Sequence, residues 1–395
     1  MKLAQRTETI TPSYTIGIST RVTELREQGK HIVNFSAGEP DFDVPEKAKK
    51  CAMKALEDNR TKYDRVPGLV DLRREIAEKL KTENQVEYEL DEIVVTNGAK
   101  QAITNTLNAI LDPGEEVLIS IPYWVSYPEI VKLCGGVPVF VLPEDQVRYK
   151  VTAKDLEKHI TSKTKILFFN NPSNPAGTLY NREEVKEIAE LCLRHQLYIL
   201  SDEIYERFCF DGEYTSVSSL SPETKEITIL VNGLSKAAAM TGLRIGYTAS
   251  SQKVAKAIAA LQGHLTSHPA TISQWAGVGA LSSCKEEING QLSVYRERRD
   301  IAMEILDGME KISYLRPGGA FYIFINISGY REYFSKENAF SIQFCERLLN
   351  DAGVACVPGI AFGLDDYMRI SYALDTESLV EGLEKIRKFL EGLKK

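Results

Sequence analysis

A lysine at the end of an apolar run is the strongest candidate for chemistry in this sequence. The run Ile227–Val231 leads into Asn232-Gly-Leu-Ser-Lys236, and three alanines follow. A solvated lysine normally lies on a charged face, so Lys236 gains little structurally from this setting. Partial burial and a nearby cation such as Arg244 both lower the pKa of an ammonium group, as a lysine that forms a Schiff base requires. Lys236 is therefore the leading candidate for a nucleophilic amine.

A carboxylate lies at the end of another apolar run. Asp202 follows Leu197-Tyr-Ile-Leu-Ser and begins Asp-Glu-Ile-Tyr205. A lone Asp in this position is most often a helix N-cap. Alternatively, a carboxylate held at a buried strand end offers a fixed negative charge to a cationic ring nitrogen. The residues alone leave both interpretations open.

Two further strand ends carry groups that suit a ligand. The turn Asn97-Gly98-Ala99-Lys100 leads into a helical pattern, and the free N–H groups of a helix start suit an anion such as phosphate. Glycine before a helix is commonplace, so this turn is a weak signal by itself. Trp124 follows the run Val117–Ser120, either at the mouth of a site or packed under a loop.

The segment Asn170–Gly177 reads NNPSNPAG and follows the apolar run Lys165–Phe169. Each proline prevents a helix or sheet from continuing, and it pushes the preceding residue toward extended or turn geometry. The sequence therefore predicts a stiff loop at the end of a strand. When the segment is taken alone, ordinary turn requirements are the better explanation of it.

Other chemistries fit this sequence poorly. Gly233-Leu-Ser-Lys-Ala237 matches a G-x-S-x-G nucleophile elbow only in part, because its fifth residue is alanine. Gly277-Val-Gly lacks the third glycine of a dinucleotide fingerprint. None of the five histidines belongs to an H-E-x-x-H motif, which metal-assisted hydrolysis on a helix would use, so we expect no metal site.

The elements that must position these residues alternate in type. Short apolar runs are separated by stretches of helical spacing such as Glu183–His195, a rhythm typical of a mainly parallel sheet with helices on both faces. Ligands of such sheets bind beyond the carboxyl ends of the strands. The predicted strands are Glu92–Thr96, Glu116–Ser120, Val137–Val141, Lys165–Phe169, Leu197–Ser201 and Ile227–Val231.

Beyond about residue 285 the pattern changes to that of an α+β domain. We expect a helix over Tyr295–Met309, a strand over Ala320–Asn326, a helix near 337–352 and a strand over Met368–Tyr372. A closing helix presents one apolar face. We predict an N-terminal arm (1–45) that joins the small domain, a large α/β domain (46–285) and a small C-terminal domain (286–395). The apolar face consists of Leu379, Leu383, Ile386, Leu390 and Leu393.

Composition narrows the functional classes. The chain has 395 residues, 43% of them hydrophobic, and a net charge of −7, which argues against a nucleic-acid surface. It shows neither a signal-peptide pattern nor a run long enough to span a membrane, so we expect a cytoplasmic protein without a membrane partner. Seven cysteines without a C-x-x-C pair suggest neither a disulfide framework nor a structural zinc site.

The order of the motifs resembles one family. From near residue 10 to the C-terminus, the chain is similar to the class I pyridoxal-phosphate-dependent aminotransferases of fold type I, most of all to the aspartate aminotransferase subgroup. This resemblance implies a large domain with a mainly parallel, seven-stranded type of sheet. The motifs are FSAGEPDF (35–42), KYDRVPG (62–68), NGAKQA (97–102), PYWVSYPE (122–129), NNPSNPAG (170–177), SDEIYE (201–206), NGLSKAAAMTGLRIGY (232–247) and MRISYA (368–373).

The resemblance implies pyridoxal 5'-phosphate as cofactor and assigns the residues around its ring. Lys236 would carry the internal aldimine and then move the proton between the substrate Cα and the cofactor as general acid and base. Asp202 would keep the pyridinium nitrogen protonated. Asn174, with a cis bond before Pro175, and Tyr205 would hydrogen-bond the phenolate oxygen, and Trp124 would stack on the ring.

The resemblance also implies a phosphate site and a dimer. The phosphate would lie on the N–H groups of Gly98 and Ala99, with Arg244 as a bidentate partner. Tyr63 would reach the phosphate of the neighbouring subunit in a homodimer with shared active sites. The chain departs from the family pattern three residues before the lysine, where Gly233 replaces the frequent Ser or Thr. Ser235 is then the nearest hydroxyl.

Substrate recognition follows from the same resemblance. Arg369 would clamp the α-carboxylate, a group that a planar guanidinium suits better than an ammonium does. The backbone of Gly38 would approach the same carboxylate, while Trp124 and Asn174 would also face the substrate. Lys100 would meet a second carboxylate, with Thr15 assisting from the N-terminal arm. A lysine in a first helical turn can equally be solvated surface.

The resulting prediction is a transaminase that moves the amino group of L-aspartate, or of a related acidic amino acid, to 2-oxoglutarate by ping-pong chemistry. Prephenate, aromatic and alanine aminotransferases are alternatives within the family. A C–S β-lyase would use the same lysine and aspartate in another enzyme class. Regulators related to this family carry an added DNA-binding domain, which we do not expect here.

Overall fold

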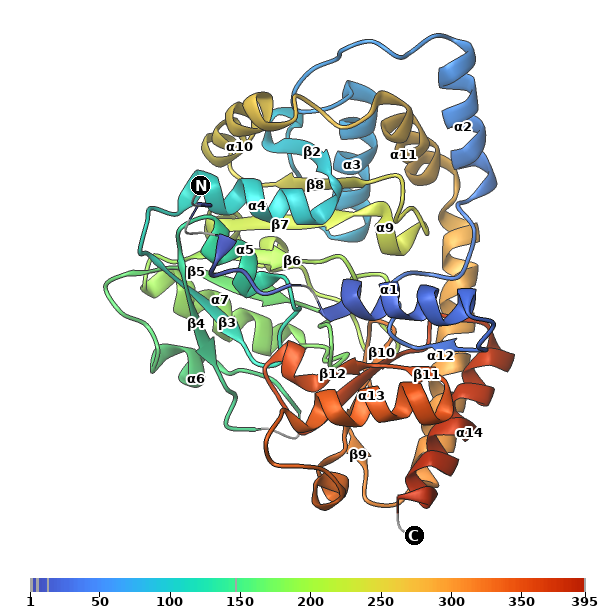
Figure 1. Cartoon of the computed structure of the whole chain (residues 1–395). Helices are drawn as coiled ribbons and strands as arrows, with labels where there is room; N and C mark the ends of the chain where they lie inside the picture. The colour runs from blue at the N-terminus through green and yellow to red at the C-terminus, as the bar shows by residue number, and fades with distance from the viewer. Residues whose placement is uncertain (1–2, 5–6, 13, 146–147, 394–395) are drawn as a thin grey trace.

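A seven-stranded sheet forms the centre of the larger part of the molecule (Figure 1). The computed structural model describes residues 3–4, 7–12, 14–145 and 148–393. Every strand pair in this sheet is parallel except the two made by β8, which runs antiparallel to β2 and β7. The spatial order is β2 (Ile93–Asn97), β8 (Ile245–Ala249), β7 (Thr228–Gly233), β6 (Tyr198–Asp202), β5 (Thr164–Asn170), β3 (Glu116–Ser120) and β4 (Val137–Val141).

Helices cover both faces of this sheet, as the sequence predicts. Alternate residues of β5 show the arrangement: Ile166 and Phe168 belong to the core on one face, and Leu167 and Phe169 to the core on the other. The first face carries α4 (Gly98–Ile110), α5 (Tyr127–Leu133) and α10 (Gln252–Leu265). The second carries α2 (Glu46–Glu57), α3 (Val70–Glu83), α11 (Thr271–Ser283), α6 (Ala153–Glu157), α7 (Arg182–Arg194) and α8 (Pro222–Ile227).

The strand β8 is missing from the six strands that the apolar runs predict. Gly246 interrupts its pattern, and glycine weakens a strand signal. The structure shows why glycine stands there: a Cβ at Gly246 would lie 2.3 Å from the backbone nitrogen of Ala99. The glycine lets the start of α4 approach the sheet closely.

The smaller domain is an antiparallel sheet covered by helices. Its strand order is β12 (Val357–Pro358), β13 (Tyr367–Ser371), β10 (Tyr322–Asn326) and β9 (Ser313–Tyr314). Four of the five predicted apolar positions lie in α14 (Thr376–Gly392) and the fifth, Leu393, follows it directly; all five are buried. The other helices are α12 (Lys285–Asp307) and α13 (Phe340–Ala352). The helix α12 begins ten residues before the predicted Tyr295, because the pair Asn289-Gly290, which is typical of a turn, hides its first turns in the sequence.

The N-terminal segment lies against the smaller domain. It contains α1 (Tyr14–Glu27) and β1 (Val33–Asn34), and β1 pairs in parallel with β11 (Val354–Ala355). Val22 and Leu25 of α1 pack with Ile32 and Ala355. The exact domain boundaries stay a prediction. The remaining short helices are α9 (Leu234–Ala237), η2 (Leu90–Glu92), η3 (Val217–Ser219), η4 (Ser328–Tyr333) and η5 (Gly359–Phe362).

Two findings bear on the compositional expectations. Among the described residues, no helix is both long and apolar enough to cross a bilayer. All seven cysteines are free thiols, and four of them, Cys192, Cys284, Cys345 and Cys356, are buried.

Candidate active site

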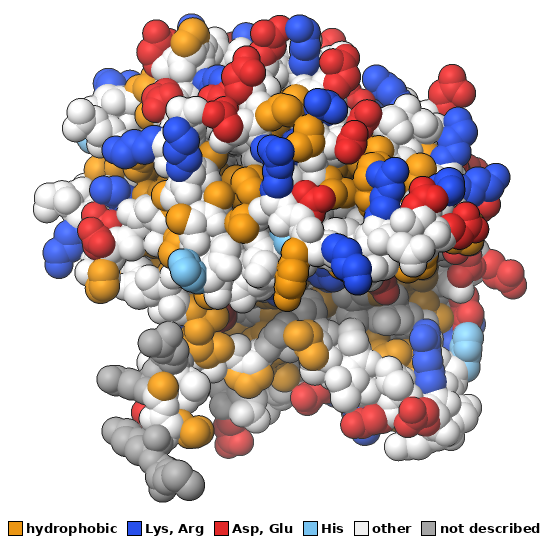
Figure 2. All heavy atoms as spheres, turned by 90° about the horizontal axis from the view of Figure 1, so that it is seen from above, with side chains coloured by type: hydrophobic (Ala, Val, Ile, Leu, Met, Phe, Trp, Pro, Cys, Tyr) orange, Lys and Arg blue, Asp and Glu red, His pale blue; other side chains and the backbone are white. Residues whose placement is uncertain are grey.

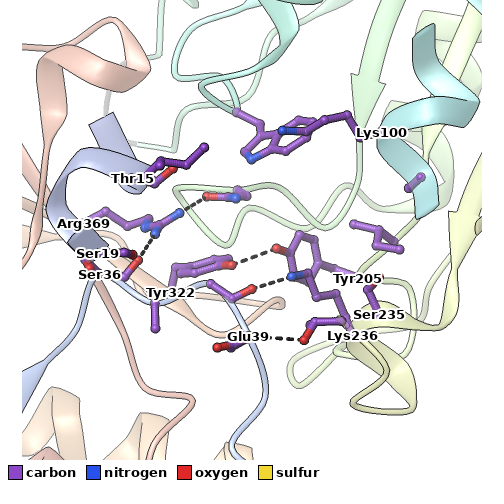
Figure 3. A pocket seen from close by; sticks show the side chains of 18 of the residues that line it. Thr15, Ser19, Ser36, Glu39, Lys100, Tyr205, Ser235, Lys236, Tyr322 and Arg369 are labelled. Atoms are coloured by element: carbon purple, nitrogen blue, oxygen red, sulfur yellow. Dashed lines mark hydrogen bonds between the residues drawn. The ribbon is translucent and has the colours of Figure 1, made fainter. Parts of the chain in front are cut away.

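A cavity of about 720 Å³ opens at the carboxyl ends of the large sheet, and α1, β10 and β13 also contribute to its wall (Figure 3). It gathers residues from the whole length of the chain. All of the predicted site residues line it except Gly98 and Tyr63. Those lining it are Thr15, Gly38, Ala99, Lys100, Trp124, Asn174, Asp202, Tyr205, Ser235, Lys236, Arg244 and Arg369.

Lys236 lies in α9, directly after the end of β7. Its half-buried ammonium donates a hydrogen bond to the backbone carbonyl of Gly38. Burial lowers the pKa of Lys236 from 10.5 to about 8; the guanidinium groups of Arg369 and Arg244 lower it too, whereas the carboxylate of Glu39 raises it. An amine with this pKa is uncharged often enough near neutral pH to act as a nucleophile.

Asp202 is the last residue of β6 and lies on the cavity floor. It is 4% exposed, and its Oδ2 accepts a hydrogen bond of 2.7 Å from the hydroxyl of Tyr127. Burial raises the pKa of Asp202 to about 6. No helix begins in the described residues that follow directly, so the N-cap interpretation is wrong. A buried carboxylate with room beside it in the cavity is a good partner for a cation.

The Asn-Pro loop is held firmly beside Asp202. The bonds before Pro172 and Pro175 are both cis, the second as the resemblance implies. Asn170 anchors the loop: its Oδ1 accepts from the backbone N–H of Asn174 at 2.9 Å, and its Nδ2 donates to the carbonyl of Asp202 at 3.0 Å. The backbone of Asn174 is therefore fixed at the cavity wall.

Arg369 projects from β13 and is 2% exposed. Its Nη1 donates to Oδ1 of Asn174 at 3.0 Å, and its Nη2 donates to the carbonyl of Ser36 at 2.9 Å (Figure 3). The guanidinium carbon lies 4.3 Å from the ring centroid of Tyr322. These contacts hold the guanidinium plane at the cavity, where it can bind a carboxylate.

Tyr322 also lines the cavity, although no motif in the sequence indicates it. Its hydroxyl lies 2.8 Å from the hydroxyl of Tyr205 across the cavity wall (Figure 3). It stands in the apolar run Ala320–Asn326, where tyrosine looks like one more core residue. Tyr127 and Glu39 were missed too, although both lie inside the quoted motifs, because a motif does not say which of its side chains face the ligand.

At the start of α4, the guanidinium of Arg244 lies against the backbone of Gly98, which carries no side chain. A Cβ at Gly98 would lie 2.3 Å from Nη2 of Arg244 and would displace this guanidinium, and the φ of +76° also favours glycine here. Ala99 and Ser235 line the cavity beside it. Gly233 also has a packing reason, since a Cβ there would lie 2.7 Å from the carbonyl oxygen of Ile245. The close approach of β7 and β8 therefore favours glycine at this position.

Lys100 stands at the rim of the cavity, with Thr15 across from it on α1 (Figure 3). The Lys100 ammonium lies 5.0 Å from the ring centroid of Trp124. Desolvation first, and then Arg244, lowers the pKa of Lys100, although its side chain is exposed at the rim. Lys100 is therefore directed along the cavity wall and is not a remote surface lysine.

Tyr63 lies outside the cavity of its own chain. Its side chain is 92% exposed and packs edge-on against His268, with ring centroids 6.0 Å apart. A tyrosine so exposed beside a positioned ring is compatible with a contact to a second subunit.

Fold and site together define the class of protein. The molecule is a fold type I enzyme, in which a mainly parallel sheet and a smaller domain enclose a lysine amine, a buried carboxylate and an arginine that can take a carboxylate. The chain belongs to the aminotransferase class I and II family, whose model matches residues 30–386.

Relatives match nearly the full length of the chain. A probable aspartate/prephenate aminotransferase of Aquifex aeolicus is 42% identical over 394 residues, covering 99% of each chain. The aspartate aminotransferase of Geobacillus stearothermophilus is 40% identical, with 99% of this chain and 100% of the relative covered. The solved structure of Thermus thermophilus aspartate aminotransferase with maleate superposes with a TM-score of 0.92 at 39% identity, covering 98% of this chain and 99% of that one.

Proposed function

We propose that this protein is an aspartate aminotransferase. It transfers the amino group of L-aspartate, or of a related acidic amino acid, to 2-oxoglutarate in a ping-pong reaction that depends on pyridoxal 5'-phosphate. The observation that carries this proposal is the placement of the Lys236 amine and the Arg369 guanidinium in one cavity, above the buried carboxylate of Asp202. Full-length relatives named for aspartate transamination support it.

The cavity fits the coenzyme. A phosphate fits the corner formed by Gly98, Ala99 and Arg244, where a side chain on Gly98 would occupy the space of the guanidinium. Asp202 is buried and accepts a hydrogen bond from Tyr127, so its carboxylate fits a protonated ring nitrogen. When bound, pyridoxal 5'-phosphate supplies an aldehyde that condenses with amines and a ring that delocalises charge from the substrate Cα.

The protein groups divide the work of proton transfer and orientation. Lys236 Nζ would offer its lone pair to the coenzyme aldehyde and would hold and move the proton at the substrate Cα. Asp202 would keep a proton on the ring nitrogen, because a buried carboxylate is stabilised by a cation beside it. Asn174 and Tyr205 would hold the ring oxygen, and Trp124 would cover the ring.

Substrate selection uses two cationic groups. Arg369 holds the α-carboxylate with its planar fork, and the carbonyl of Gly38 lies near the reacting amine. Lys100 meets the side-chain carboxylate from the cavity wall that lies across from Thr15 of α1. A dicarboxylic amino acid satisfies both groups at once, while a monocarboxylic one leaves Lys100 unpaired.

The proposal includes a homodimer whose two subunits share their active sites. The exposed large hydrophobic side chains include Met53 and Leu56 on α2, Tyr63 beyond it and Leu265 at the end of α10. Figure 2 looks down on this side of the molecule and shows hydrophobic side chains gathered between charged ones. Such exposed hydrophobic side chains favour association with a second copy. Sedimentation analysis tests the dimer, and a monomer that keeps full activity would contradict shared active sites.

The reaction is tested by following the two half-reactions of purified holoenzyme separately. Aspartate should convert the bound coenzyme to its amine form, and 2-oxoglutarate should restore the aldehyde form. A panel with prephenate, alanine and aromatic amino acids compares the alternatives through kcat/KM; prephenate belongs in it because a 42% identical relative is named for it. Pyruvate and ammonia from cystathionine would instead indicate a C–S β-lyase. The predicted cytoplasmic location is tested by cell fractionation.

A further inference from the structure

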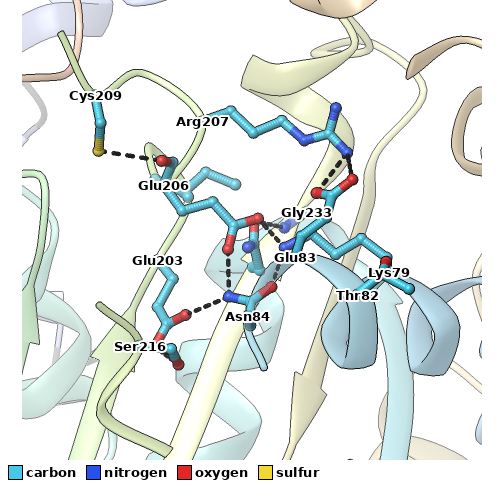
Figure 4. Close-up of polar contacts among 12 residues, drawn as sticks. Lys79, Thr82, Glu83, Asn84, Glu203, Glu206, Arg207, Cys209, Ser216 and Gly233 are labelled. Carbon is cyan, nitrogen blue, oxygen red and sulfur yellow. Dashed lines mark hydrogen bonds and ion pairs between the residues drawn. The ribbon is translucent and has the colours of Figure 1, made fainter. Parts of the chain in front are cut away.

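The turn after β6 presents side chains to two different environments. Asp202 and Tyr205 line the cavity, whereas Glu203 and Glu206 lie among buried polar groups (Figure 4). The backbone links these environments, since the N–H of Glu206 donates to the carbonyl of Glu203 at 3.0 Å. Any shift of the glutamates must therefore move the aspartate and the tyrosine.

The end of α3 holds both glutamates. Asn84, the residue after this helix, donates from Nδ2 to Glu206 at 2.6 Å and to Glu203 at 3.2 Å. Lys79 donates to Oε1 of Glu206, and at 2.7 Å to Oδ1 of Asn84. One turn after Lys79, the carboxylate of Glu83 accepts two hydrogen bonds of 2.8 Å from Nη2 of Arg207. One helix end thus anchors three residues of the turn.

Glu203 has donors around its whole carboxylate. It is 0% exposed, and its Oε1 accepts from Ser201 at 2.9 Å and from Ser216 at 2.8 Å. Its backbone N–H donates to the carbonyl of Val231 in β7, the strand that leads to Lys236. Glu203 therefore joins the strands that carry the two principal chemical groups of the site.

The charge of this cluster is held away from solvent. Glu203, Glu206 and the ammonium of Lys79 are all buried, and isolated buried charges are costly unless they are paired and hydrogen-bonded. Burial first, and then the charge of Glu206, raises the pKa of Glu203 to about 7, while the pairing with Lys79 leaves the pKa of Glu206 lowered. A core that only needed to be stable would be served by apolar residues, so a role in positioning explains the network better.

We propose that Glu203 and Asn84 are positioning residues that fix the turn from Asp202 to Tyr205 against the coenzyme. This inference deepens the proposed function and rests on it. Neither residue lines the cavity, so neither touches substrate, and both act through the backbone of the turn. Its effect is to hold the carboxylate and the hydroxyl within the small tolerance that productive geometry requires.

The test compares variants by coenzyme binding and by spectrum. We expect Glu203→Ala and Asn84→Ala each to raise the Kd for pyridoxal 5'-phosphate and to lower kcat by about 10-fold, with KM for aspartate nearly unchanged. The pH at which the coenzyme absorption band changes should shift as well. Glu203→Gln should restore much of the loss, because the two serine hydroxyls can turn to accept from the new amide.

A matched control separates positioning from general stability. Glu92 pairs with Lys225 at 2.9 Å in another partly buried ion pair of the same domain. Glu92→Gln should lower the melting temperature without changing the Kd or the absorption band. Wild-type Kd and spectrum in the alanine variants would overturn the inference. If Glu203→Ala does not fold, Asn84→Ala decides alone; a wild-type chain that binds no coenzyme would refute the proposed function itself.

Discussion

Nη1 of Arg369 donates a hydrogen bond of 3.0 Å to Oδ1 of Asn174, although 195 positions separate the two residues. The bond joins β13 of the smaller domain to the Asn-Pro loop of the large sheet. It holds the arginine in the plane that a carboxylate needs, and it places the substrate anchor beside a residue proposed to contact the coenzyme. The stiffness of the loop therefore serves both ligands.

Replacing the arginine should test this arrangement. Arg369→Lys keeps the charge but loses the fork and at least one of the hydrogen bonds to Asn174 and Ser36. We expect kcat/KM to fall by about 100-fold for every amino acid, because a charge-assisted hydrogen bond contributes about 1.5–3 kcal/mol. Steady-state kinetics with aspartate and alanine measures this fall in kcat/KM. An effect confined to aspartate would contradict a role at the α-carboxylate.

Removing the lysine amine should abolish covalent capture of the coenzyme. Lys236→Ala should fold and bind pyridoxal 5'-phosphate weakly, and it should lose about 10,000-fold in kcat, since both the nucleophile and the proton carrier are gone. Borohydride treatment followed by mass spectrometry should find an adduct in the wild type and none in the variant. An adduct retained by the variant would place the amine elsewhere.

The reactivity of the lysine should depend on pH with a midpoint near 8. The pKa of Lys236 is lowered from 10.5 to about 8, so the reactive uncharged amine accumulates as pH rises through 8 and is lost below it. The rate of condensation of apoenzyme with the coenzyme aldehyde, followed by absorbance, should rise with pH and level off above this value. A midpoint near 10.5 would contradict the burial of the amine.

A substitution of Glu39 tests whether nearby charges shift the pKa of Lys236 in the expected direction. Its carboxylate raises the pKa of Lys236. Glu39→Gln removes this charge but keeps an oxygen that can accept from Thr241, which bonds Glu39 at 2.9 Å. The midpoint of the same rate profile should therefore move to lower pH. Glu92→Gln should leave it in place, and an upward shift in Glu39→Gln would contradict the electrostatic account.

Lys100 should select dicarboxylic substrates. Its ammonium stands at the cavity rim beside Trp124, opposite Thr15. Lys100→Ala should raise KM for aspartate and 2-oxoglutarate by about 10-fold or more, through the loss of one charge-assisted contact. KM for alanine should change little, which makes the monocarboxylic substrate the internal control. Equal changes for both substrates would remove Lys100 from substrate selection.

Much of this molecule could be predicted from local pattern. The six apolar runs became strands of the large sheet, and the leucine spacing of α14 became its buried face, because periodicity depends only on near neighbours along the chain. The strand β8 could not be found this way, since Gly246 serves a contact with the distant residue Ala99. The early start of α12 was hidden by Asn289-Gly290.

The sequence by itself determined which chemical groups stand at the strand ends: the amine of Lys236, the carboxylate of Asp202 and the stiff loop around Asn174. Only the tertiary structure decided how these groups meet. It placed Tyr322 against Tyr205, and it lowered the pKa of the amine by surrounding it with protein and cations. The physical reason is that burial and electrostatic contact depend on residues far apart along the chain, which no local pattern contains.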